Sequence, residues 1–175
     1  PTLTEALEQG ADLVLASGDK LVGGPQAGLI LGKKGWVERV ARHPLARAMR
    51  ADKLLLAALE ATVAGPTPPV LEALHTEPAA LKTRTEKLAR AIHERVNVTC
   101  EVVPHDGRVG GGGGAEVPIP GWALRVPEHL ASELRALERP IIATTRDGAC
   151  LIDVRCIPEF EDDELAGAIA ALMKR

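Results

Sequence analysis

Apolar and polar positions in the first part of the chain predict helices around two short buried strands. We expect helices over residues 4–9, 36–42 and 45–64, and strands over residues 11–16 and 29–31. Thr4 and Gly10 suit the two ends of the first helix, as N-cap and as C-terminal stop. The second helix must end before His43 and Pro44, because a residue that precedes proline resists the helical region. The third is rich in Ala and Leu, which favours one long helix.

After residue 70 the pattern predicts an α+β arrangement. We expect helices over residues 70–75, 77–95, 128–137 and 160–173, and strands over residues 96–103, 122–126, 140–145 and 149–154. Asp147 and Gly148 are typical of the turn of a β-hairpin between the last two strands. Residues 107–115 hold five consecutive glycines at 110–114 and predict a flexible loop. An antiparallel sheet covered by helices follows from this order.

A proline-rich break separates these two parts. Residues 65–69 read GPTPP, which interrupts both helix and strand, so we place a domain boundary there, between residues 1–65 and 66–175. Two strands do not make a stable sheet alone. We therefore expect the first part to be the end of a larger domain whose other strands lie upstream, and the residue at position 1, Pro rather than Met, agrees with that expectation.

Composition narrows the function classes. The 175 residues are 46% hydrophobic, which excludes wholesale disorder, but only 2% are aromatic, which disfavours base-stacking platforms for single-stranded nucleic acid. The formal net charge is −3, yet residues 31–53 contain seven Lys and Arg against two acids, a local balance of +5 that leaves −8 elsewhere. Such a segment suits a phosphate-bearing ligand, or equally an ordinary solvated helix face.

The spacing of the cysteines and the short length of the apolar runs indicate a cytoplasmic protein. The three cysteines, Cys100, Cys150 and Cys156, lack zinc-site spacing, so we expect reduced thiols and no metal site. No apolar run approaches the roughly 20 residues of a membrane helix, and no signal peptide is evident. We therefore expect no membrane association.

Candidate chemistry concentrates in residues 17–28, SGDKLVGGPQAG, which contain four glycines and follow an apolar strand. The spacing does not match a phosphate-binding loop, because Lys20 precedes most of the glycines. One reading is a lysine that forms a Schiff base, which needs an amine at a fixed strand end with close backbone approach to a flat cofactor. The other reading is a solvated lysine on an ordinary loop.

Two runs, SGDKLVGGPQAGLILGKK and HPLARAMRADKLLLAALEAT, closely resemble bacterial selenocysteine synthases, the L-seryl-tRNA(Sec) selenium transferases. PIIATTRDGACLIDVRC resembles the last hairpin of that family, whereas residues 65–107 and 159–164 depart from it. The resemblance implies an α/β protein related to fold-type I transferases that depend on pyridoxal 5'-phosphate. On that basis residues 1–65 end the large cofactor domain and residues 66–175 form a small α+β carboxy-terminal domain.

The resemblance also implies an activity. Members convert seryl-tRNA(Sec) to selenocysteinyl-tRNA(Sec) with selenophosphate, through a dehydroalanyl intermediate, and assemble as homo-oligomers built from dimers with active sites between subunits. Residues for cofactor stacking and tRNA binding are then expected upstream, so the 175 residues alone are expected to be inactive. A related lyase acting on a small phosphorylated or amino-sugar substrate, and a non-catalytic interaction module, stay open as alternatives.

Residue roles follow from the same resemblance. Lys20 is expected to form the Schiff base with the cofactor, Ser17 to contact its phosphate or cap the turn, and Asp19 to orient Lys20 or hydrogen-bond within the loop. The rest of the loop lines the cofactor or a neighbouring subunit's site, or is simply a structural turn: Gly23, Gly24 and Gln26.

Two arginines are the candidate substrate-binding residues. Arg47 and Arg50 are three positions apart at the start of the expected long helix, so they should share a face and bind an oxyanion. The resemblance assigns them to the selenophosphate donor, and an ordinary basic helix face is the alternative. His43 is better explained as a structural residue before Pro44 than as a proton carrier.

Overall fold

The computed structural model describes residues 2–110 and 117–174 and divides into two compact units, unit 1 (Pro1–Glu72) and unit 2 (Ala73–Arg175). The division falls inside helix α5 (Pro69–His75), just after the proline-rich break. The assignment of the two parts to a large cofactor domain and a small domain stays a prediction.

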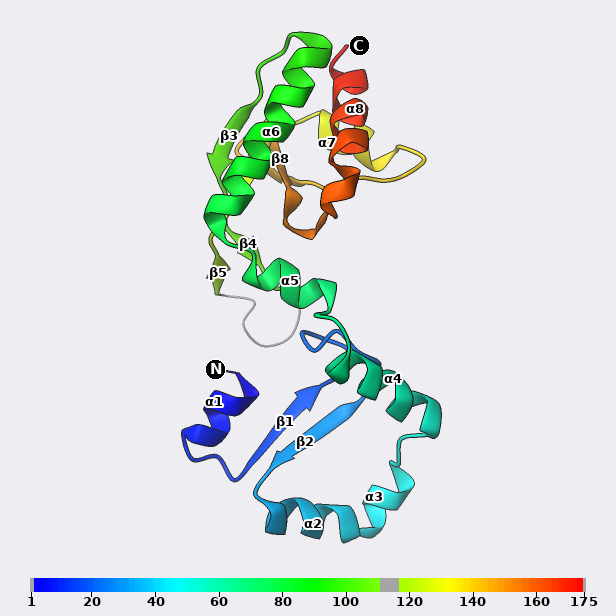
Figure 1. The fold of residues 1–175 in the computed structure, drawn as a ribbon. Helices are drawn as coiled ribbons and strands as arrows, with labels where there is room; N and C mark the ends of the chain where they lie inside the picture. The colour runs from blue at the N-terminus through cyan, green and yellow to red at the C-terminus, as the bar shows by residue number, and fades with distance from the viewer. Residues whose placement is uncertain (1, 111–116, 175) are drawn as a thin grey trace. The chain divides into compact units, whose positions relative to one another are not determined.

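Unit 1 is built on an antiparallel pair of strands, β1 (Leu13–Ser17) and β2 (Gly28–Gly32), with Leu13 opposite Gly32 and Ser17 opposite Gly28. Helix α1 lies beside β1; α2 and α3 follow the end of β2, and α4 returns toward the loop that joins β1 to β2 (Figure 1). The helices of unit 1 before α5 are α1 (Leu3–Glu8), α2 (Lys34–Arg42), α3 (Pro44–Ala48) and α4 (Lys53–Ala64).

Local signals explain most helix ends in unit 1. The predicted cap of the first helix is wrong by two residues: Thr2 accepts from the Glu5 amide at 3.2 Å, and the Glu5 carboxylate accepts from the Thr2 amide at 2.8 Å. This reciprocal capping box fixes the start of α1 better than Thr4 could. α2 ends at Arg42 as predicted, and the His43 ring accepts from the Leu45 amide at 3.2 Å to begin α3.

The expected long helix over residues 45–64 is wrong in its first part. α3 ends at Ala48 and α4 begins only at Lys53, because the Asp52 carboxylate accepts from the Leu55 amide at 2.9 Å and acts as an N-cap in extended geometry. Arg50 therefore lies in the connection between two helices. The premise that it shares one helix face with Arg47 does not hold.

One segment of the described chain has the length and composition of a membrane span. Residues Lys53–His75 have a mean hydropathy of 1.4 over their best window, and none of that window is buried. Composition therefore contradicts the expectation that no apolar segment approaches this length. The segment is nevertheless divided into α4 and α5, of 12 and 7 residues, each short of the roughly 20 that a span requires. A single such segment is weak evidence for a membrane helix.

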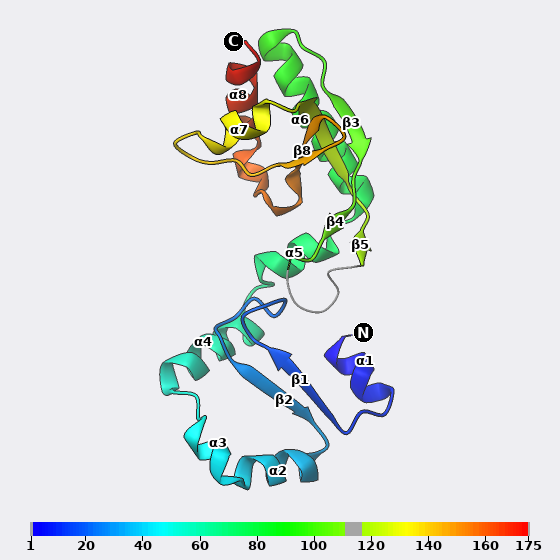
Figure 2. The same ribbon diagram turned by 180° about the vertical axis from the view of Figure 1, so that it is seen from behind.

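Unit 2 has a four-stranded antiparallel sheet in the order β3-β6-β8-β7, with helices packed against it. Helices α6 and α8 run side by side, and α7 packs on α8 and β6 (Figures 1 and 2). The strands are β3 (Glu101–Pro104), β6 (Trp122–Pro127), β7 (Thr144–Arg146) and β8 (Ala149–Asp153), and a separate pair is β4 (Gly107–Arg108) with β5 (Pro118–Ile119). The helices are α6 (Pro78–Val96), α7 (Leu130–Arg135) and α8 (Asp162–Met173), with 3-10 turns η1 (Val154–Cys156) and η2 (Glu159–Glu161).

The turn of the expected hairpin is confirmed, with Asp147 at φ 50° and Gly148 at φ 70°, both positive as a type I′ turn requires. Its first strand, expected over residues 140–145, is wrong at its start, because β7 begins only at Thr144. The strand expected over residues 96–103 is wrong at its start. α6 continues through Val96 and ends at Asn97, whose φ of 54° makes it a left-handed C-cap, so β3 begins only at Glu101. The glycine-rich loop was expected at 107–115: its first two residues form β4, and positions 111–115 lie outside the described residues.

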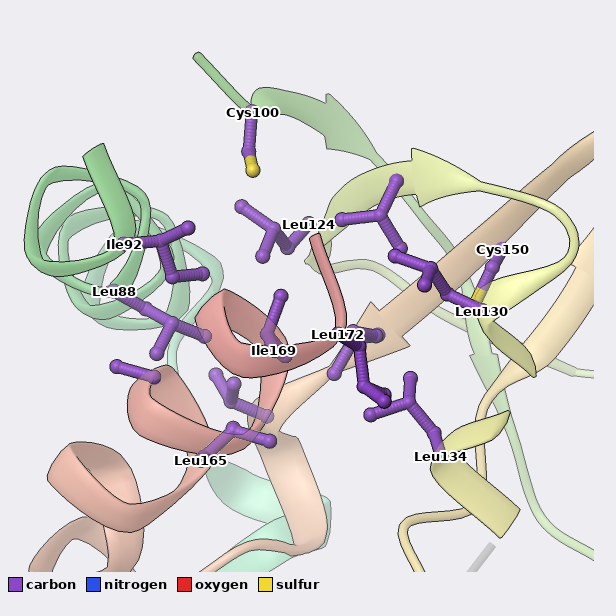
Figure 3. Close-up of a cluster of buried hydrophobic side chains, with 14 of the residues drawn as sticks. Leu88, Ile92, Cys100, Leu124, Leu130, Leu134, Cys150, Leu165, Ile169 and Leu172 are labelled. Atoms are coloured by element: carbon purple, nitrogen blue, oxygen red, sulfur yellow. The ribbon is translucent and has the colours of Figure 1, made fainter. Parts of the chain in front are cut away.

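The core of unit 2 is one continuous apolar cluster between the sheet and the helices (Figure 3). Leu124, Leu134 and Ile169 are 0% exposed. Burying one such side chain stabilises the fold by about 1.5–3 kcal/mol. The buried members are Leu81, Leu88, Ile92, Cys100, Leu124, Val126, Leu130, Ala131, Leu134, Cys150, Ile152, Val154, Leu165, Ala166, Ile169 and Leu172.

Two arginines form hydrogen bonds to chain segments at the edge of this core. Arg84 binds Asp162 through Nε at 2.9 Å and Nη2 at 2.6 Å, and also donates to the carbonyls of Val154 and Ile157 at 3.0 and 2.7 Å. Arg155 donates to backbone carbonyls from two further segments of unit 2, those of Ala73 at 3.1 Å and Pro120 at 2.6 Å. Arg155 belongs to the run that resembles the last family hairpin, and its contacts show a structural role there.

Candidate functional site

The loop between β1 and β2 is held by its own backbone. The Gly18 amide donates to the Ala27 carbonyl at 2.8 Å, and the Gly24 amide donates back to the Gly18 carbonyl at 2.7 Å. The Gly23 amide donates to the Lys20 carbonyl at 2.9 Å. These three bonds span the loop, so the backbone at Lys20 is fixed even though no regular structure surrounds it.

The Lys20 side chain is exposed within the turn that follows β1. Among the described residues, no hydrogen bond or ion pair engages its amine. An amine on a fixed backbone that is not committed to a carboxylate partner is available to a carbonyl ligand.

Ser17 and Asp19 pair with each other. Ser17 Oγ donates to Asp19 Oδ1 at 2.5 Å. This hydrogen bond is the main reason that the pKa of the Asp19 carboxyl lies below its ordinary value, and the positive charge of Lys20 acts in the same direction. Asp19 is therefore an anion next to Lys20 at neutral pH.

Glycine is required at two loop positions for steric reasons. A Cβ on Gly18, which is buried, would lie 2.6 Å from the Pro25 carbonyl oxygen. Gly23 has φ +76°, a backbone conformation that side-chain-bearing residues rarely adopt. Gln26 is exposed. The structure thus supports the turn-forming role of the glycines directly.

Three residues that face the Lys20 loop, Thr62, Pro68 and Val70, were not predicted from the sequence. A Cβ on Gly24 would lie 3.3 Å from Thr62, and one on Gly23 would lie 2.7 Å from Pro68 and 3.0 Å from Val70. The signal available in the sequence is that the second resembling run ends at Thr62. Nothing in the pattern links the proline-rich break to the lysine loop.

The arginines lie apart from this loop. Arg47 belongs to α3, which lies toward the opposite end of the β1–β2 hairpin from the Lys20 loop (Figures 1 and 2). Arg47 and Arg50 are exposed, and within residues 2–110 and 117–174 neither forms an ion pair. Their guanidinium groups are free for an anion, but the fold of one chain does not bring the α3 arginine to Lys20.

Other basic residues of the same segment are engaged locally. Lys33 forms an ion pair with Asp12 at 2.6 Å, and the Arg39 guanidinium lies 4.6 Å from the centre of the Trp36 ring. In the part of the chain that the structure describes, no group of three or more His, Cys, Asp or Glu side chains could hold a metal ion.

The donor set of the loop fits one end of pyridoxal phosphate. It offers a primary amine at a fixed backbone position, a hydroxyl at Ser17 and exposed glycine backbone at Gly23. Trp36, the aromatic residue of unit 1, belongs to α2, at the opposite end of the β1–β2 hairpin from the loop (Figure 1), so no aromatic ring is among the loop's described neighbours.

Comparison with known proteins gives a consistent family. A family model described as L-seryl-tRNA selenium transferase matches residues 1–158. A protein named L-seryl-tRNA(Sec) selenium transferase from Moorella thermoacetica is 37% identical over 190 residues, covering 99% of this chain and 40% of the relative. Its namesake from Solidesulfovibrio magneticus is 39% identical over 183 residues, covering 94% and 38%. That from Aquifex aeolicus is 33% identical over 175 residues, covering 93% and 38%.

This chain therefore spans about 40% of the length of the curated relatives that it matches. The family match covers unit 1 and, in unit 2, the chain as far as Pro158, and it includes the Lys20 loop, the α3 arginine and the last hairpin. The chain belongs to the L-seryl-tRNA selenium transferase family, a family of transferases.

Proposed function

We propose that the protein converts seryl-tRNA(Sec) to selenocysteinyl-tRNA(Sec), with selenophosphate as the selenium donor and pyridoxal 5'-phosphate as cofactor. The observation that carries this proposal is the exposed, unengaged amine of Lys20 on a hydrogen-bonded glycine loop, in a chain of this family. The same proposal includes a fold-type I architecture, a homo-oligomer built from dimers and a cytoplasmic location.

Each loop residue has a stated part. When bound, pyridoxal phosphate supplies an electron sink for changes at the substrate's α- and β-carbons. Lys20 would hold the cofactor through its amine, and Gly23, Gly24 and Gln26 would line the cofactor. The Ser17 hydroxyl would donate to the cofactor phosphate, and the Asp19 carboxylate would orient the Lys20 amine.

Arg47 and Arg50 bind the anionic selenium donor in this proposal. Their exposed guanidinium groups form no ion pair with any described residue, as a site for a free oxyanion requires. Since α3 lies away from the Lys20 loop of its own chain, active sites shared between subunits give these residues access to the reaction. A related lyase is not favoured, because each relative reported above carries the selenium transferase name.

Borohydride reduction of the intact protein with pyridoxal phosphate tests the lysine assignment. We expect one pyridoxyl group, mapped by peptide mass spectrometry to Lys20, and none in a Lys20→Arg variant. A modified residue other than Lys20, or no modification at all, rules out the proposed cofactor role.

Steady-state kinetics with seryl-tRNA(Sec) and selenophosphate test the arginines. Losing one charged hydrogen-bond partner costs about 1.5–3 kcal/mol, so Arg47→Ala or Arg50→Ala should raise the KM for selenophosphate about tenfold to a hundredfold. Arg42→Ala is the matched control, because Arg42 already faces Glu38 at 3.7 Å. If the KM for selenophosphate is the same in all three variants, Arg47 and Arg50 do not bind the selenium donor.

A further inference from the structure

The Lys20 loop of unit 1 rests against the end of α4 and the segment after it. Pro68 and Val70 approach Gly23 so closely that a Cβ there would lie 2.7 Å from Pro68 Cβ and 3.0 Å from Val70 Cγ1. Thr62 faces Gly24, where a Cβ would meet both Thr62 Oγ1 and Thr62 Cγ2 at 3.3 Å. We call Thr62, Pro68 and Val70 the support cluster.

The support cluster is itself fixed. Thr62 Oγ1 donates to the Ala58 carbonyl one turn earlier in α4 at 2.8 Å, which holds the side chain in one rotamer with its Cγ2 facing the loop. Pro68 is restrained by its ring and is followed directly by the first residue of α5. The loop therefore meets a rigid surface.

The contact reaches Lys20 in two steps. The cluster packs against Gly23 and Gly24, and the amides of these glycines donate to the carbonyls of Lys20 at 2.9 Å and of Gly18 at 2.7 Å. If the cluster recedes, the two glycines gain room and both hydrogen bonds weaken. The backbone that carries the Lys20 side chain would then lose its fixed position.

We propose that Thr62, Pro68 and Val70 are positioning residues for Lys20, and that the end of α4 and the start of α5, with the segment between them, set the position of the Lys20 amine. The mechanical part of this inference rests on the loop geometry alone, and its catalytic meaning rests on the proposed function. The glycines at positions 23 and 24 are then needed partly because this cluster occupies the space that side chains would fill.

The first test measures amide hydrogen exchange in peptides containing Gly23 and Gly24, in the intact protein without cofactor. Thr62→Ala removes both atoms that face Gly24, and Val70→Ala removes Cγ1; each should speed exchange of the loop amides about tenfold. Thr62→Val keeps the shape and loses only the bond to Ala58, so its loop should exchange as in the unsubstituted protein.

This comparison separates positioning from helix stability. Ala has a higher helix propensity than Thr or Val, so an effect through α4 alone would leave Thr62→Ala at least as protected as Thr62→Val. Unchanged loop exchange in Thr62→Ala, or equal acceleration in Thr62→Val, overturns the inference.

The second test measures the rate at which pyridoxal phosphate becomes borohydride-trappable on Lys20. Thr62→Ala should slow it about tenfold, since misplacement of a reacting group costs rate steeply. Gly24→Ala should slow it as well, by crowding Thr62. In the double variant the new methyl group takes the space that Thr62 vacates, so part of the rate should return.

The double variant is decisive because independent effects add. Additive losses overturn the inference, and a partial recovery supports it. If the unsubstituted protein forms no adduct on Lys20, the proposed function fails, and the exchange measurement alone then decides the positioning inference.

Discussion

The two units of this chain hold their shapes by different means. Unit 2 closes one cluster of buried side chains between a sheet and three helices. In unit 1, among the described residues up to Glu72, Gly18 alone is buried, and its form rests on the β1–β2 ladder, helix caps and the bonds within the Lys20 loop. The Lys20 loop, which carries the candidate chemistry, therefore lies in the unit that buries fewer of its own residues.

Unit 1 also exposes large apolar side chains on its strands and helices. Leu15 of β1 is 75% exposed and Leu54 of α4 is 83% exposed. Exposed apolar surface on this scale is typical of faces that another protein surface covers.

The largest expected effect comes from deleting a core side chain in unit 2. Leu124→Ala should lower the free energy of unfolding by about 3–5 kcal/mol, because Leu124 is 0% exposed and leaves a cavity. Leu54→Ala, the matched change in unit 1, should alter it by less than about 0.5 kcal/mol. Urea unfolding followed by Trp122 fluorescence in a Trp36→Phe background, and by Trp36 fluorescence in a Trp122→Phe background, measures each unit.

A large loss in Leu54→Ala, read from Trp36, would break the comparison. It would mean that α4 is covered in solution, and dependence of that loss on protein concentration would identify a second copy as the cover.

A smaller difference in the free energy of unfolding is expected when one ion pair is removed from each unit. The Arg84 and Asp162 side chains are 13% and 29% exposed, so Arg84→Ala should cost about 2–3 kcal/mol by leaving Asp162 and two carbonyls without their donor. The Lys33 and Asp12 side chains are 67% and 57% exposed, and Lys33→Ala should cost no more than about 1 kcal/mol. Thermal unfolding at low and high salt checks both, and equal losses would show that exposure does not set the difference.

Structural features set by one or two neighbouring residues were predictable from the sequence. Features in which a capping residue overrides the propensity of the surrounding segment were not. The hairpin at Asp147 and Gly148 and the end of α2 before Pro44 follow from backbone rules for single residues. Helix propensity over residues 45–64 hid the break at Asp52, because a side chain that caps the backbone overrides an Ala- and Leu-rich pattern. A β-branched run likewise hid the C-cap at Asn97.

The candidate site shows the same division. The run from Ser17 to Gly24 identified the lysine loop, because its chemistry is contiguous in sequence. The support from Thr62 and Val70 depends on a packing contact across some 40 positions, which no local pattern encodes. Family resemblance supplied roles for Arg47 and Arg50 but not their placement on separate structural elements.

Thiol reactivity should follow burial within unit 2. Burial raises the pKa of Cys100 and of Cys150 above the ordinary value of 9.0, whereas Cys156 is exposed. A thiol whose pKa is higher in the folded state than in the unfolded state stabilises the fold fully at pH values below its unfolded pKa. This stabilisation is lost as pH rises from the unfolded pKa through the folded pKa, so unit 2 should lose stability above about pH 9. Iodoacetamide should label Cys156 first and the buried thiols only on unfolding. Early labelling of Cys150 would show that the core opens locally.

The smallest expected effect lies in unit 1, at Asp19. The Ser17 hydroxyl is the main cause of its lowered pKa, so Ser17→Ala should raise that pKa toward the ordinary 3.8, as read from the carboxyl carbon in an NMR titration. A lowered folded pKa stabilises the loop above the unfolded value, and this contribution disappears as pH falls through the folded pKa. Ser132→Ala in unit 2 is the control, because Ser132 donates to the His129 carbonyl and should leave Asp19 unchanged. If the pKa stays low in Ser17→Ala, the Ser17 hydroxyl is not its main cause, and the backbone hydrogen bond of Asp19 and the positive charge of Lys20 account for it instead.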